Sequence, residues 1–123
     1  MSPRLVRERG SATVVMLGVI AMVLVVTVAG LMLASAVLAS HRARAAADLS
    51  ALAAAGLLIA GKPPVAACER AAQVASANHG RVQSCHAVGT EVRLSVAVPA
   101  SLRGLGVATA KSRAGPAPGG PAD

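Results

Sequence analysis

The chain has 123 residues, a formal net charge of +7 and no aromatic residue. This length allows one small domain. The charge is a poor indication of nucleic-acid binding, because no aromatic side chain is present for base stacking and the arginines after residue 60 are scattered along the chain. We interpret it as a solvated basic surface, which is favoured beside anionic lipid headgroups.

The first expected element is a transmembrane helix over residues 11–40, preceded by a basic cytoplasmic leader over residues 1–10. From Ser11 to Ser40 the chain has 30 consecutive residues without a charge. A bilayer core needs about 20 apolar helical residues, so this run is long enough to cross it. Three arginines precede the run and two follow it closely, which favours a cytoplasmic N-terminus and an extracytoplasmic C-terminal domain in the cell membrane.

A cleavable signal peptide is the competing interpretation of the same segment. The triplet Ala34-Ser35-Ala36 fits a small-x-small cleavage site, and cleavage near Ala36 would release a secreted small basic binding protein. The apolar part of a signal peptide is about 7–15 residues, roughly half the length of this run. Anchoring is therefore favoured, and the step from Gly30 to Ala34 is a candidate helix-packing site because two small residues let helices approach closely.

Residues 41–60 are expected to extend the helix beyond the membrane, since they are rich in Ala and Leu. Spacings of three and four residues put Leu49, Leu52 and Ala53, with Gly56 and Ala60, on one stripe, the pattern of a packed helix face. Arg44 and Asp48 are four residues apart, the spacing at which an ion pair forms on the exposed side. The Gly61–Pro64 segment is expected to end the helix, because Pro disfavours helical conformation in the residue before it.

Residues 61–114 predict a small extracytoplasmic α+β domain. The sequence indicates a helix over 65–78, with Cys68, Ala71, Ala72 and Ala75 on its inner face and His79-Gly80 at its end. Strands are expected over 81–88 and 91–98, joined by a Gly89-Thr90 hairpin turn, with a third over 107–113. The predicted fold class is thus α+β: a long N-terminal helix, a short helix and a two- or three-stranded antiparallel sheet. Residues 115–123, with three Pro and three Gly, predict a disordered tail.

Cys68 and Cys85 are the only cysteines, and we predict a disulfide between them. A bridge that closes a loop of this size contributes on the order of 3 kcal/mol, and disulfides persist in oxidising compartments. The alternative is a zinc site of these two cysteines with His79 and His86, which would indicate a zinc-dependent regulator. The spacing resembles a zinc finger only superficially, so the disulfide is favoured.

No catalytic set emerges from the sequence. A nucleophile needs a base and an orienting group, whereas the three histidines lie apart and the acidic residues show no pairing pattern. We therefore predict a protein that is not an enzyme and has no cofactor, no metal, no nucleic-acid partner and no small-molecule substrate. Its expected partners are membrane lipid and other envelope proteins.

Two stretches that flank the apolar run carry a family resemblance. They are Arg9-Gly10-Ser11-Ala12 and the segment from Arg42 to Ala53, RARAAADLSALA. Together they resemble the N-terminal part of TadE/TadG-like proteins of tight-adherence (Flp) pilus assembly, particularly the small actinobacterial members, over about residues 9 to 55. Asp48 and the run Ala51-Leu52-Ala53 match the family's characteristic Asp and Ala-Leu-Ala positions.

The resemblance implies a minor pseudopilin-like component of a pilus or secretion apparatus, which contacts other subunits through its N-terminal helix. It also implies cleavage by a prepilin peptidase between Gly10 and Ser11. The chain departs from the pilin pattern at the fifth residue after Gly10, where Val15 stands in place of the usual Glu.

Overall fold

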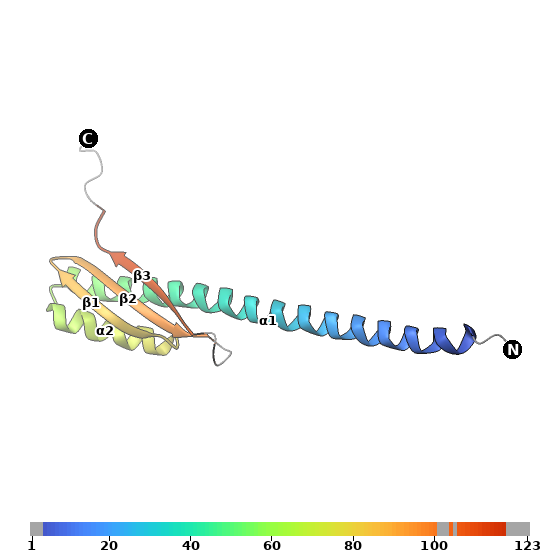
Figure 1. Cartoon of the computed structure of the whole chain (residues 1–123). Helices are drawn as coiled ribbons and strands as arrows, with labels where there is room; N and C mark the ends of the chain where they lie inside the picture. Colours follow the sequence, from blue (N-terminus) through green and yellow to red (C-terminus); the bar gives the residue numbers. More distant parts are fainter. Residues whose placement is uncertain (1–3, 101–103, 105, 118–123) are drawn as a thin grey trace, which may run out of the picture. The chain divides into compact units, whose positions relative to one another are not determined.

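The computed structural model describes residues 4–100, 104 and 106–117, with side chains from Gly10 onward (Figure 1). The elements are α1 (Arg4–Ile59), α2 (Pro64–Ala77), β1 (Arg81–Val88), β2 (Glu91–Pro99) and β3 (Val107–Ala114). The three strands form one antiparallel sheet in the order β1-β2-β3. The predicted α+β class is confirmed, and the third strand is present. The chain divides into two compact units, Met1–Ala34 and Ser35–Asp123.

In the first unit, α1 is apolar on every side from Ser11 to Ala34. All the large apolar side chains from Val14 to Leu33 are between 46% and 70% exposed. Thr27 satisfies its hydroxyl within the helix by donating to the carbonyl oxygen of Val23 at 2.8 Å. A helix that is apolar all round is stable only when something other than water surrounds it. Of the described residues, this one helix is long and apolar enough to cross a membrane.

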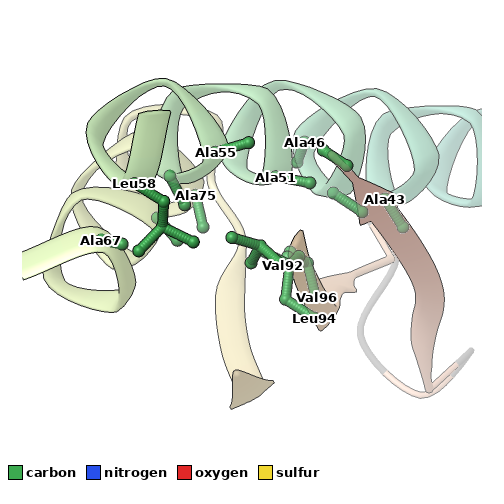
Figure 2. Close-up of a cluster of buried hydrophobic side chains, with 14 of the residues drawn as sticks. Ala43, Ala46, Ala51, Ala55, Leu58, Ala67, Ala75, Val92, Leu94 and Val96 are labelled. Carbon is green, nitrogen blue, oxygen red and sulfur yellow. The ribbon is translucent and has the colours of Figure 1, made fainter. Parts of the chain in front are cut away.

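In the second unit, α1 and α2 pack on the same face of the sheet, and most of the helical side chains in this core are alanines (Figure 2). The sheet contributes β-branched and Leu side chains from β2, with Val92 and Val96 fully buried. The buried residues of the two helices are Ala39, Ala43, Ala46, Ala47, Ser50, Ala51, Ala54, Ala55 and Leu58 on α1, and Ala67, Ala71 and Ala75 on α2. Alanine lets the helix backbones lie close to the sheet, and most of the larger residues of α1 in this unit, with the exception of Leu58, are on its other side.

The predicted packed stripe on residues 41–60 is therefore wrong. Leu49 is 49% exposed, Leu52 is 64% exposed, and Gly56 and Ala60 are also exposed. Ala53 alone of that stripe is partly buried. Hydrophobic spacing identified a helix correctly, but Leu49 and Leu52 do not lie on its packed face.

Helix α1 ends because Gly61 adopts a left-handed conformation, with φ of +79°. The amide of Lys62 donates to the carbonyl oxygen of Leu57 at 2.9 Å, and the amide of Gly61 donates to that of Leu58 at 3.0 Å. These two bonds satisfy carbonyl groups that the helix leaves free, as in a Schellman motif. Helix α2 then starts with Pro64, whose fixed φ suits the first helical turn.

Helix α2 ends in the same way, but with His79 in the left-handed position, at φ of 59°. The glycine follows one residue later. A Cβ on Gly80 would lie 2.7 Å from Cγ1 of Val96, so Gly80 is required by the close approach of the turn to β2. The predicted bounds of this helix were within one residue, although Ala72, expected on the inner face, is exposed.

The sheet follows the predicted hairpin. Gly89 has φ of +61°, as a two-residue turn requires, and β1 and β2 pair from Val88 with Glu91 onward. A register shift between Val82 and Ser84 leaves one extra residue in β1. Strand β3 extends one residue beyond its predicted end. Of the predicted tail, residues 118–123 lie outside the described part of the chain.

Candidate interaction surface

The exposed side of α1 in the second unit carries an apolar stripe, formed by Ala45, Leu49, Leu52, Gly56 and Ile59. The spacings between successive members are four, three, four and three residues, which keeps them on one line of the helix. Leu49, Leu52 and Ile59 are 49%, 64% and 66% exposed. This apolar stripe lies roughly opposite the alanines that face the sheet. It has the spacing that a second helix recognises in a coiled coil.

The sequence did not predict that the apolar stripe is exposed. Apolar periodicity identifies a helix, but it does not tell which face of the helix is buried. A second stripe runs along the same segment through Ala43, Ala47, Ala54 and Leu58. The signal available in the sequence was residue size. A helix packed against a sheet at short distance needs small residues, and this face is almost entirely alanine.

Asp48, one of the residues that carry the family resemblance, lies beside β3. Its Oδ1 accepts a 2.7 Å hydrogen bond from Oγ of Ser112. The predicted ion pair with Arg44 does not form, and the ion pairs among the described residues are those of Glu91. The matching run is divided between two faces of α1, with Ala51 buried, Leu52 in the apolar stripe and Ala53 partly buried.

The predicted disulfide is confirmed. Cys68 on α2 is bonded to Cys85 on β1, with the two Cα atoms 6.0 Å apart. Neither sulfur is a thiolate available to zinc in this state. Among the described residues, no three His, Cys, Asp or Glu side chains are grouped so that they could hold a metal ion.

The remaining predicted positions lie on α1 within the first unit. Gly10 and Ser11, the expected prepilin-peptidase cleavage position, are exposed in the helix. Gly30 and Ala34 are also exposed, and a Cβ added to Gly10 or Gly30 would meet no atom within 4 Å. The helix surface is open at both positions, so a second helix can approach there closely.

The face of the sheet away from the helices is polar and basic. Its ion pairs join Glu91 Oε1 to Arg93 Nε at 2.7 Å and Glu91 Oε2 to Arg113 Nη2 at 2.5 Å. The hydrogen bonds from Arg93 and then Arg113 lower the pKa of the Glu91 carboxyl below its ordinary value of 4.5. The side chain of Arg93 is 64% exposed, that of Arg113 is 60% exposed and that of Glu91 is 33% exposed, so water screens both pairs.

We compared the chain with protein-family models, curated proteins and solved structures, and none of the three comparisons found a match.

Proposed function

We propose that the chain is a TadE-like, single-pass membrane protein with a structural role in a pilus or secretion apparatus. In this role its N-terminus lies in the cytoplasm and the chain after Ser40 lies outside. The protein performs no catalysis and joins other subunits through α1. The observation that carries the proposal is the apolar stripe on α1, which lies beyond the predicted membrane span.

A helix that served only to anchor the domain would have no need of this stripe. Large apolar side chains gain about 1.5–3 kcal/mol when they are buried, and alanine gains much less. This chain nevertheless buries alanines against the sheet and leaves Leu49, Leu52 and Ile59 in solvent. Another helix packed along the stripe would recover that free energy, and the four-three spacing fits such a partner.

The disulfide supports an extracytoplasmic position for the second unit, because such bonds persist in oxidising compartments. The family resemblance supports the choice of a pilus or secretion apparatus, through Asp48 and the Ala51-Leu52-Ala53 run. Cleavage between Gly10 and Ser11 would remove the charged leader and leave the apolar helix free to pack among other subunits. Intact-mass measurement of membrane-extracted protein tests this step, and an N-terminus at Met1 or Ser2 contradicts it.

A second candidate function rests on a different observation. The compact second unit begins at Ser35, within the small-x-small triplet at residues 34–36. Cleavage near Ala36 would therefore release a unit that retains its own core, as a secreted basic binding protein. Cell fractionation separates the two candidates, since the anchored protein sediments with membranes and the released one is found in the medium.

The assembly role is tested by replacing Leu49 and Leu52 together with Ser. Both side chains are exposed, so the free energy of unfolding should change by less than about 1 kcal/mol. The wild type, extracted from its native membranes in mild detergent, should sediment as a complex, and the double variant should sediment as a monomer. A matched control replaces the exposed Val65 and Val88 with Ser and should keep the complex. A monomeric wild type contradicts the proposal.

A further inference from the structure

A shallow groove of about 480 Å³ lies on the open, polar face of the sheet, away from the apolar stripe. Its lining includes Arg93, Lys111, Arg113 and His86, with Ser84 and Ser95 between them. No carboxylate lines it in the described part of the chain. Glu91 lies nearby and neutralises only part of the charge of the two arginines.

Three of the basic residues that line the groove are in register across the three strands. His86 is opposite Arg93, and Arg93 is opposite Arg113. Arg93 and Arg113 are like charges directly opposite each other, an arrangement that destabilises a sheet, and the two ion pairs of Glu91 offset part of this cost. Lys111 lies two residues from Arg113 on the same face and makes no ion pair among the described residues. The basic residues that line the groove therefore indicate a surface that binds an anionic ligand.

The serines add hydrogen-bond donors between the cations. Ser84 lies on the groove side of β1 because it alternates regularly with His86, and the register shift comes before it, between Val82 and Ser84. Ser84 is opposite Ser95, and Ser95 is opposite Lys111. The two serine Oγ atoms are 3.0 Å apart and share one hydrogen bond. That bond uses one hydroxyl hydrogen, so the second hydroxyl retains a hydrogen that it can donate to a ligand.

The arginines also retain donors. Arg93 contacts Glu91 through Nε, and Arg113 contacts it through Nη2. The other guanidinium nitrogens of both residues make no hydrogen bond within the described residues. A ligand in the groove would therefore meet two guanidinium groups, one ammonium group and a hydroxyl. A phosphate group matches this set of donors, because it carries several acceptor oxygens around one small anionic centre.

We propose that this groove binds a phosphate group, as a free anion or as part of a lipid headgroup. Arg93 and Arg113 would donate from their unused guanidinium nitrogens, Lys111 would supply the unpaired charge, and the serine hydroxyl would donate from the floor. Glu91 opposes binding, because it competes for both arginines. The proposal is independent of the assembly role of α1.

The test uses the full chain, labelled with ¹⁵N, in dodecyl maltoside micelles, which contain no phosphate. Sodium phosphate replaces sodium chloride at constant ionic strength, and amide shifts are followed by NMR. The amides of Ser95, Lys111 and Ser112 should move and saturate. A second titration uses dihexanoyl phosphatidylglycerol. Saturation by both probes identifies the phosphate group itself, saturation by one identifies its source, and saturation by neither overturns the proposal.

Three variants test whether the dissociation constant changes as the groove predicts. Lys111→Gln should weaken binding about fivefold, and Glu91→Gln should tighten it about threefold by freeing the arginines. Arg70→Gln removes a charge at another exposed position, on α2 and outside the groove, and should leave the dissociation constant within about twofold of the wild type. Equal effects of Lys111→Gln and Arg70→Gln would show only a general response to charge and would overturn the groove as a site. The same spectra report whether each variant is folded.

Discussion

Ser112 on β3 donates a 2.7 Å hydrogen bond to Asp48 on α1, across 64 positions of the chain. The bond fastens an edge strand of the sheet to the long helix. It also gives Asp48, which the family resemblance singled out, a role in the fold. The carboxylate holds β3 against the helix, where small side chains alone provide little contact area.

We expect Ser112→Ala and Asp48→Asn each to lower the free energy of unfolding by about 0.5–1.5 kcal/mol, because the bond is charge-assisted but exposed. The double variant should cost clearly less than the sum of the two single variants, since both remove the same bond. Urea denaturation of the full chain in micelles measures all three. Strict additivity would contradict a direct contribution of this bond.

Ser50 is fully buried on α1, and its Oγ has no hydrogen-bond partner among the described residues. Burial of an unpaired hydroxyl costs about 1–3 kcal/mol. Ser50→Ala should therefore raise the free energy of unfolding by about 1 kcal/mol or more. Ser76→Ala, at an exposed position of α2, is the control for helix propensity and should give about 0.5 kcal/mol or less. An equal gain at both positions would mean that the buried hydroxyl carries no penalty.

Substitutions at two adjacent residues at the end of α2 should have opposite effects on the free energy of unfolding. His79→Gly should stabilise the chain by about 0.5–1 kcal/mol, because Gly adopts the left-handed conformation without strain. Gly80→Ala should destabilise it by about 1–3 kcal/mol, because the new Cβ would meet Val96 at 2.7 Å. Thermal unfolding followed by circular dichroism measures both changes. Destabilisation by His79→Gly would show that the histidine side chain makes a favourable contribution at this turn.

Glu91 makes stability depend on pH. The hydrogen bonds from Arg93 and Arg113 lower its pKa in the folded state below the ordinary value of 4.5, so the unfolded chain binds a proton more readily. The stabilisation is complete above that ordinary value and is lost as the pH falls through the lower, folded-state pKa. The stability difference between wild type and Glu91→Gln should therefore shrink on acidification below about 4.5. A stability difference that stays constant below this pH would contradict the prediction.

The disulfide should make a large contribution in so small a unit. Replacement of Cys68 and Cys85 together with Ala should lower the free energy of unfolding by about 3 kcal/mol, because the bridge joins residues 17 positions apart and so closes a loop in the unfolded chain. Denaturation of the oxidised wild type, the reduced wild type and the double variant checks this. The reduced wild type should resemble the variant. A reduced wild type as stable as the oxidised protein would contradict the prediction.

The sequence by itself determined the elements and the disulfide. An uncharged run of 30 residues, alternation along β2, Gly89 in the hairpin and Gly61 before two prolines are local signals, and each predicts structure in its own neighbourhood. The pairing of Cys68 with Cys85 followed because the chain offers no other cysteine.

Only the tertiary structure decided which side of α1 is buried, which residue each carboxylate contacts, and which basic residues lie side by side on the sheet. Asp48 contacts Ser112 rather than Arg44, and His86, Arg93 and Arg113 meet through strand register. These relationships join residues that are distant in sequence, so local patterns do not contain them. The exposure of the stripe that was predicted to be packed has the same origin. The sheet lies so close to α1 that alanine fits against it, and Leu49 and Leu52 remain on the exposed side.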